Sequence, residues 1–153
     1  MGGFLIRVVI RPATGSDAKR VAEVYLSARR AAVPAIPPSV HTDQATIDWV
    51  RRCVTEAGWV WVAEVDGKIQ GLLMLADCFV DQLYVAPAYT GRGIGLSLLR
   101  HAKNRCPAGL QLWTFRANVR ARRFYERHGF RAVEETDGSG NEEHAPDVRY
   151  VWP

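Results

Sequence analysis

The chain lacks any hydrophobic run that approaches the roughly 20 apolar residues of a membrane-spanning helix. Its apolar start, residues 4–10, is short and is interrupted by Arg7. It has neither the basic flank nor the small-residue cleavage site of a secretory signal. Solenoid-like repeats and low-complexity segments are also absent. We therefore expect a cytoplasmic protein without a membrane partner.

Cysteine is also scarce. Cys53, Cys78 and Cys106 are odd in number, lie far apart and form no Cys-x-x-Cys pair. This pattern favours three reduced, partly buried thiols over a zinc site or a disulfide. We expect no bound metal.

What the chain does contain is the composition of a globular protein, with 48% hydrophobic and 24% charged residues. A domain of about 150 residues hides roughly 68–70% of its unfolded surface, which is enough for a proper core. Because no linker divides the sequence, we expect a single domain over residues 1–153.

Charge is distributed unevenly, although the formal net charge is only +4. The stretch 116–131 holds six arginines and one acid, and the stretch 134–147 holds six acids and no lysine or arginine. Two poles of opposite sign suggest one anionic and one cationic partner. A nucleic-acid binder would spread aromatic residues along the basic stripe, but Phe124 and Tyr125 are adjacent, and the acidic stretch would repel phosphate. We expect no nucleic-acid partner.

Hydrophobic spacing and turn residues predict the element order β-α-α-β-β-β-α-β-α-β-β. The predicted strands are residues 5–10, 59–65, 68–75, 79–85, 110–115, 130–135 and 148–152. The first predicted helix follows the capping box Thr14-x-x-Asp17, and the second begins near Thr42 or Asp43 and ends at Gly58. The last two span 96–105 and 118–128. This order indicates an α+β domain with a mixed sheet.

The glycine-rich segment Thr90-Gly-Arg-Gly-Ile-Gly95 leads from a strand directly into a helix. Free N–H groups at a helix start attract anions, and glycines let the backbone approach phosphates closely. No Lys-Ser or Lys-Thr is present for a Walker A loop, and a dinucleotide fingerprint counted from Gly91 would place Leu96 in its last position. A tight structural turn is the alternative interpretation.

Two segments together resemble the GNAT N-acetyltransferase superfamily. The segment Thr90–Leu96 is similar to its pyrophosphate loop, with Thr90 where the family usually has Arg or Gln. The segment from Asn118 to Phe130 resembles its second signature, with an Asn that opens a helix, then Phe-Tyr, then Gly-Phe. The resemblance implies the GNAT fold, in which helices flank a mixed, mostly antiparallel central sheet. It also implies an N-acetyltransferase that uses acetyl-CoA.

The resemblance further implies which residues contact acetyl-CoA. Loop amides hold the pyrophosphate, the strand Leu83–Val85 pairs with the pantetheine arm and supplies an oxyanion donor, and Arg92 and Arg122 suit the 3′-phosphate and adenine end. The expected contact residues are Leu83, Tyr84, Val85, Thr90, Gly91, Arg92, Gly93, Ile94, Gly95, Leu96, Asn118, Arg122, Phe124 and Tyr125.

For catalysis, Tyr125 matches the family position whose phenol protonates the departing thiolate; an aromatic core residue is the alternative. Asp81 is a candidate general base, because it is an acid in an apolar strand and is expected to share a face with Leu83 and Val85. A strand-edge carboxylate is its alternative. His41, in a Pro-rich loop, is a second candidate at the acceptor pocket. A water chain in place of any single base also stays open.

The acceptor is expected to be an amine of a small molecule, a protein N-terminus or a lysine. The acidic stretch 134–147 borders the acceptor groove in this fold, so it either favours a cationic acceptor or only solubilises a hairpin tip. A non-catalytic acyl-CoA-binding module or sensor is the alternative function. Trp49, Trp59 and Trp61 suit either the core or a dimer face, which leaves a homodimer open.

Overall fold

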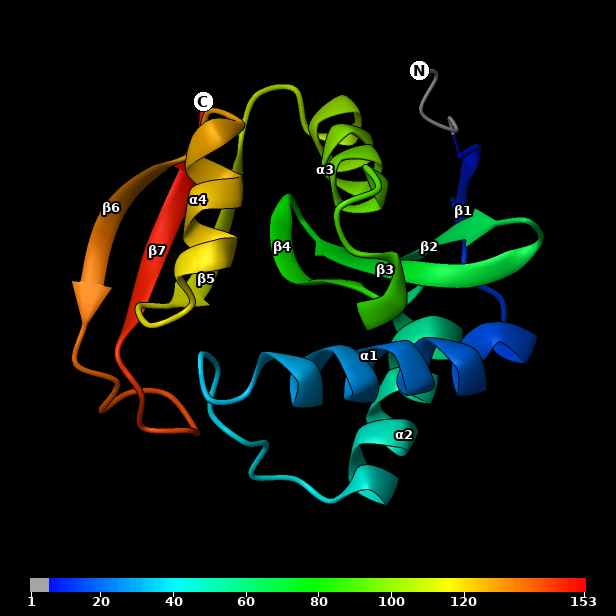
Figure 1. The fold of residues 1–153 in the computed structure, drawn as a ribbon, viewed down its shortest axis with the longest axis horizontal. Coiled ribbons are helices and arrows are strands. Elements are labelled where there is room, and N and C mark those ends of the chain that lie inside the picture. Colours follow the sequence, from blue (N-terminus) through cyan, green and yellow to red (C-terminus); the bar gives the residue numbers. More distant parts are fainter. Residues whose placement is uncertain (1–5) are drawn as a thin grey trace.

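The computed structural model describes residues 6–153, and its elements follow the predicted order (Figure 1). The elements are β1 (Val8–Pro12), α1 (Ala18–Ala32), α2 (Asp43–Arg52), β2 (Val60–Val65), β3 (Lys68–Ala76), β4 (Phe79–Val85), α3 (Ile94–Arg105), β5 (Leu110–Phe115), α4 (Val119–Arg127), β6 (Arg131–Thr136) and β7 (Asp147–Trp152). The first strand begins and ends later than predicted, and Leu5 lies outside the described residues.

A seven-stranded sheet with the strand order β1-β2-β3-β4-β5-β7-β6 forms the centre of the molecule. Every neighbouring pair is antiparallel except β4 and β5, which run parallel. The predicted mixed, mostly antiparallel sheet flanked by helices is therefore confirmed (Figure 1).

The parallel junction between β4 and β5 is short. The two strands pair only at Phe79 with Gln111 and at Val80 with Leu112, while β4 continues to Val85 and β5 to Phe115. The strands therefore part after two residue pairs and leave a gap inside the sheet.

Local signals fix where the helices begin and end. Thr14 N–H donates to Asp17 Oδ2 at 2.8 Å, as the capping box requires. Thr42 caps α2 by accepting from the Ala45 N–H at 3.1 Å. The helical path continues through a π-helical turn, Cys53–Ala57, and ends at Gly58, whose φ of 66° is left-handed.

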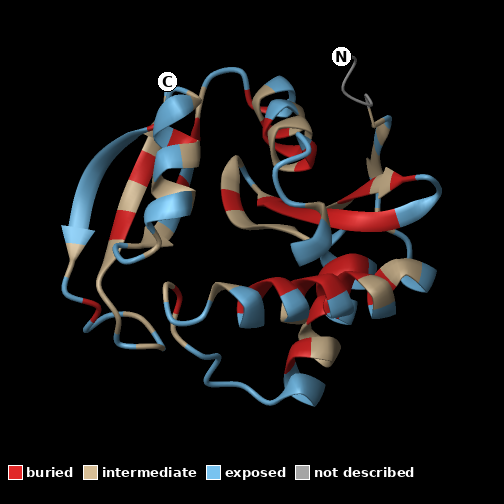
Figure 2. Cartoon of the chain, in the orientation of Figure 1, coloured by how far each residue is buried: buried red, intermediate tan, exposed pale blue. Residues whose placement is uncertain are grey.

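Two apolar cores lie on opposite faces of the sheet. One joins α3 and α4 to residues such as Leu73, Leu112 and Tyr150, and the other joins α1 and α2 to residues such as Val62 and Leu72. Figure 2 shows that most of β3 is buried, whereas β6 is almost entirely exposed. The helices thus cover β4 from both sides and leave the β6 edge in solvent.

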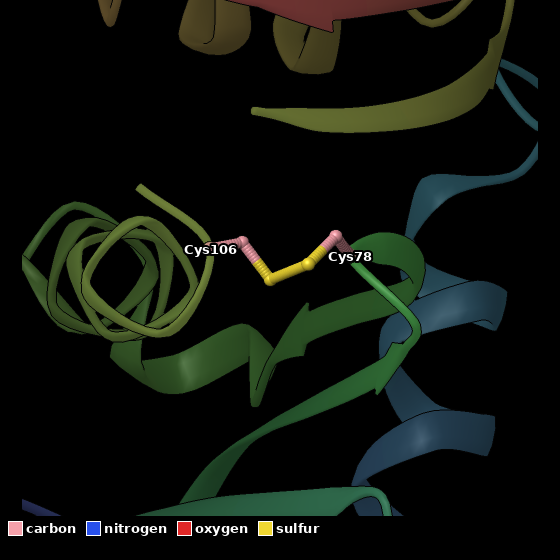
Figure 3. Close-up of a disulfide and its surroundings, with 2 residues drawn as sticks. All are labelled: Cys78 and Cys106. Atoms are coloured by element: carbon pink, nitrogen blue, oxygen red, sulfur yellow. A yellow bond between two sulfur atoms is a disulfide. The ribbon is translucent and has the colours of Figure 1, made fainter. Parts of the chain in front are cut away.

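The structure corrects the expectation of three reduced thiols. Cys78, at the start of β4, forms a disulfide with Cys106, at the end of α3 (Figure 3). Only Cys53 is free, and it is buried. The fold brings two thiols together across a sequence separation of 28, a contact that spacing along the chain does not reveal.

The three tryptophans Trp49, Trp59 and Trp61 are partly buried and pack against the two cores, so they serve the core. Among residues 6–153, no helix combines the length and apolar character needed to cross a bilayer.

Candidate active site

The glycine loop opens α3 with two residues in the left-handed region. Gly91 has a φ of 76°, and Gly93, the residue before the helix, has a φ of 84°. A Cβ added at either position would meet no atom within 4 Å, so the space beside both is open. The first backbone donor of the helical ladder here is Ser97, to Gly93 O at 3.0 Å. Helix geometry leaves the preceding N–H groups without an intrahelical acceptor, so they are available to an anion.

The side chains around this loop differ in how far contacts within the chain already occupy them. Thr90 donates to Pro87 O at 3.2 Å, and Arg92 is exposed with its guanidinium carbon 4.9 Å from the centre of the Tyr89 ring. Arg122 donates to the Tyr150 hydroxyl at 2.9 Å and to Arg116 O at 3.2 Å. The fold itself therefore uses Arg122, whereas Arg92 remains accessible to a phosphate.

Backbone groups of β4 line the gap between β4 and β5. Ala86 N–H donates to Gln70 O of β3 at 2.8 Å. Because donors along an antiparallel ladder alternate in direction, the N–H groups of Leu83 and Val85 face away from β3 and into the gap. Tyr84 lies between these two residues, so its N–H and C=O face β3, and only its side chain is available to a ligand.

A cavity of about 80 Å³ lies in this gap, and Asp81, Tyr84, Asn118 and Tyr125 are among its lining residues. Asn118 caps α4 by accepting from the Ala121 N–H at 3.3 Å. The expected helix-ordering role of Asn118 is thus present, and its side chain also borders the cavity.

Tyr125 is buried, with 8% of its surface exposed, and it lines the cavity. Its ring lies edge-on to Phe124 and Phe130, with centroids 5.2 Å and 5.5 Å apart. Burial, followed by the charge of Tyr84, raises the pKa of Tyr125 well above its usual value. The phenol therefore stays protonated at neutral pH.

The Phe124 ring of α4 lies beside the start of α3. A Cβ added at Gly95 would lie 3.6 Å from the Phe124 ring and 3.8 Å from Val85. The glycine loop, the edge of β4 and α4 therefore adjoin one another around the gap.

Asp81 occupies an irregular position in β4. Leu75 of β3 pairs with Val80, and Met74 pairs with Gln82, so Asp81 is the extra residue of a β-bulge. Burial raises the pKa of Asp81, and a 3.4 Å hydrogen bond from the Gln82 amide offsets part of that effect.

The bulge interrupts the regular alternation of side chains at Asp81, so its sharing a face with Leu83 and Val85 stays a prediction. Those two side chains pack against the core on the α3 side. Asp81 lines the same cavity as Leu83 and Tyr125. Its charge also raises the pKa values of Tyr25 and Cys53, after burial as the main cause, and both residues belong to the core on the α1–α2 side.

Two residues on that side were missed in the sequence. Tyr25 of α1 packs edge-on against Tyr84, with ring centroids 5.2 Å apart, and against Trp49 at 5.6 Å. Arg29, one helical turn later, is only 9% exposed, with its guanidinium carbon 5.9 Å from the centre of the Tyr25 ring. An arginine four residues after Tyr25, on the apolar face of α1, was the available signal.

The guanidinium of Arg29 is incompletely paired. Nη2 donates to Pro37 O at 3.3 Å and lies 3.7 Å from Glu143 Oε1, beyond hydrogen-bond distance. Nε is buried and has no partner among the described residues. Burial alone would lower the pKa of Arg29, but Tyr84, Tyr25 and Glu143 more than offset this, so the group remains charged.

The acidic stretch between β6 and β7 is largely paired within the chain. Glu142 Oε2 lies 2.8 Å from His41 Nε2, and Glu143 lies beside Arg29. The two loops lie side by side in Figure 1, with the β6–β7 loop next to the loop that follows α1. The two acids most suited to attract a cationic acceptor are thus occupied by His41 and Arg29.

Comparison with known proteins agrees with this geometry. Residues 56–132 match the family model described as an acetyltransferase (GNAT) domain. The peptidyl-lysine N-acetyltransferase YiaC of Escherichia coli K12 is 31% identical over 127 residues, which cover 82% of this chain and 85% of that protein.

Solved structures show the same fold. Apo YjaB from Escherichia coli superposes with a TM-score of 0.78 at 22% identity, over 95% of this chain and 97% of that one. The PaiA N-acetyltransferase from Thermoplasma acidophilum, a complex with coenzyme A, gives 0.70 at 21% identity, over 95% and 98%. The family-model match spans half of the chain and includes both the glycine loop and α4, and so this protein is an acyltransferase of the GNAT N-acetyltransferase family.

Proposed function

We propose that the protein transfers an acetyl group from acetyl-CoA to a primary amine. The gap between β4 and β5 carries this proposal, because Leu83 and Tyr125 line one cavity there. Val85 of the same strand and the Phe124 ring reach Gly95 at the start of α3. A donor that lies along β4 would have its phosphates at the helix start and its reactive end beside Tyr125.

The residues of the glycine loop fit this donor. The space beside Gly91 and Gly93, which any side chain would enter, is open for a pyrophosphate, and the helix N-terminus provides N–H groups and a favourable dipole. Arg92 is the accessible cation for the phosphates. When bound, acetyl-CoA supplies a thioester carbonyl for the amine and a thiolate that leaves.

Tyr125 serves as the general acid. Its raised pKa keeps a proton on the phenolic oxygen at neutral pH, and its place in the cavity lining lets it donate that proton to sulfur. The N–H groups of Leu83 and Val85 are placed to donate hydrogen bonds to the carbonyl oxygen.

Asp81 serves the acceptor amine. As a half-buried carboxylate with a raised pKa, it is a better proton acceptor than an exposed aspartate. It takes the proton of the amine directly or through water. His41, exposed and beside Glu142, lies at the outer loops and is a residue of the acceptor entrance.

Relatives support an amine acceptor. YiaC and the YjaB protein of Salmonella typhimurium are both named peptidyl-lysine N-acetyltransferases. A lysine side chain, a protein N-terminus or a small amine is therefore the acceptor class that we propose. A protonated phenol at this cavity favours catalysis over a non-catalytic acyl-CoA-binding module.

Thiol release from acetyl-CoA in the presence of an amine library tests the proposal. We expect amine-dependent release of CoA and a product in which an acetyl group has replaced one hydrogen of the amine, identified by mass spectrometry. Tight binding of acetyl-CoA with no acetylated product from any amine would instead favour the non-catalytic module.

A further inference from the structure

The surroundings of Tyr25 and Tyr84 hold one buried cation and one half-buried anion that do not pair with each other. The charges of Arg29 and Asp81 both act on the pKa values of Tyr25 and Tyr84, whose rings lie edge-on to one another. No ion pair joins Arg29 to Asp81 within residues 6–153. The two opposite charges thus flank the same pair of aromatic rings.

Arg29 has the chemistry of a binding residue with unused capacity. A guanidinium has five N–H donors in a planar fork that matches a carboxylate. Here the guanidinium donates to Pro37 O and interacts with the Tyr84 hydroxyl, the contact with Glu143 is long, and Nε is buried without a partner among the described residues. Leaving a buried donor unpaired is unfavourable, so a ligand that supplies an acceptor atom would be stabilised.

From this arrangement we infer that the acceptor carries a carboxylate close to the amine that is acetylated, and that Arg29 binds this carboxylate while the amine lies toward Asp81. The inference rests on the proposed acetyltransferase function and names its substrate class. Tyr25 and Tyr84 form the wall between the two charged ends. The carboxylate belongs either to a free amino acid or to an acidic side chain beside a peptidyl lysine.

Glu143 lies where the carboxylate of the acceptor would approach Arg29. Its carboxylate lies 3.7 Å from Arg29 Nη2, where an incoming carboxylate would bind. Glu143 therefore competes with the acceptor, and its removal should improve binding of anionic acceptors. A purely structural Arg29–Glu143 contact predicts the opposite, because both substitutions would then loosen the same loop and impair catalysis in the same direction.

The test measures kcat and KM for matched acceptors at saturating acetyl-CoA. The pairs are free L-lysine with L-lysine amide, and a lysine peptide flanked by Glu with the same peptide flanked by Gln. We expect kcat/KM to favour the carboxylate member of at least one pair by roughly 10- to 100-fold, as for a hydrogen bond to a charged group. The pair that shows the preference identifies the source of the carboxylate.

Variants assign that preference to Arg29. We expect Arg29→Gln to raise KM for the preferred acceptor roughly 10- to 100-fold more than KM for the neutral member, and Glu143→Gln to lower KM for the preferred acceptor. Arg30→Gln is the matched control, since the neighbouring Arg30 side chain is 63% exposed and pairs with Asp43. Arg29→Lys keeps the charge and tests the fold, with acetyl-CoA affinity and thermal unfolding as readouts.

Equal kcat/KM for both members of both pairs would overturn the inference, even if the enzyme acetylates all of them. Parallel losses in Arg29→Gln and Glu143→Gln would also overturn it, in favour of a structural contact. Failure to acetylate any amine would overturn the proposed function itself, and the two failures are thereby distinguished.

Discussion

Asp81 and Tyr125 line the same cavity. Tyr125 belongs to the core on the α3–α4 side, whereas the charge of Asp81 acts on residues of the α1–α2 side. In the proposed mechanism these residues are the proton donor and the proton acceptor, and backbone donors of β4 face the space between them. This arrangement suits amine acetylation, because one group takes the proton that leaves the amine and the other protonates the thiolate.

Replacing Tyr125 by Phe should lower kcat by about 10²-fold or more, in the range of a lost general acid. Acetyl-CoA affinity should change little, since the aromatic ring is retained. Steady-state kinetics and calorimetry measure the two effects. Tyr150→Phe is the control, because its hydroxyl is bonded to Arg122 and Glu126 inside the fold. That variant should lose stability rather than rate, and an unaltered rate in Tyr125→Phe would remove this phenol from the mechanism.

Replacing Asp81 by Asn should change stability with a definite pH dependence. Because burial raises the folded-state pKa of Asp81, the unfolded chain holds the ionised form more readily, and ionisation of Asp81 therefore destabilises the wild type at neutral pH. The variant should have the higher Tm at pH 7, and its advantage should shrink as pH falls toward the unfolded-state value of about 3.9. A constant difference in Tm across this range would mean that the carboxylate is not desolvated.

The same variant tests catalysis. If Asp81 accepts the proton of the amine, Asp81→Asn should lower kcat/KM and remove the acidic limb of its pH profile that this carboxylate produces. An unchanged profile would assign proton removal to a water chain instead.

Substituting Gly93 by Val should weaken acetyl-CoA binding at least about 10-fold, because a side chain would enter the phosphate space and β-branched residues resist a positive φ. Gly67→Val is a matched control: Gly67 also has a positive φ, of 75°, and open space around it, but lies in the β2–β3 turn. Both variants should lose similar stability, and only the first should lose affinity by calorimetry. Equal affinities would contradict the loop assignment.

Removing the Cys78–Cys106 disulfide should lower the free energy of unfolding by about 3.6 kcal/mol, the chain-entropy expectation for a loop of this size. The bridge closes a loop with a sequence separation of 28. Denaturant unfolding with and without reductant measures the effect in the wild type. The Cys78→Ala, Cys106→Ala double variant should match the reduced wild type and ignore reductant. A reductant effect that persists in the double variant would place the sensitivity elsewhere.

Local patterns predicted most of the fold. The strands Phe79–Val85 and Leu110–Phe115 have the predicted bounds, with Pro87 closing the first apolar run and Gly109 preceding the second. Gly58 and Asn118 act at the helix ends where their backbone preferences place them. The glycine loop was also visible, since its chemistry resides in one continuous segment.

The features that were missed depend on contacts between distant segments. The bulge at Asp81 arises from the register of β4 against β3, which hydrophobic spacing within β4 does not encode. The disulfide needs the end of α3 to meet the start of β4. Arg29 is distinguished from Arg30 only by which side of α1 faces Tyr84, and its unpaired Nε appears only once the loops after α1 and β6 are in place.

The parting of β4 and β5 has one further consequence. A strand edge with free N–H groups at a protein surface is a template on which a second chain can add, and it invites aggregation. Here the edge of β4 lies between α3 and α4 on one side and α1 on the other, so it is set back from the surface. The molecule can therefore keep unpaired backbone donors of β4 at its centre without presenting them as an outer sheet edge.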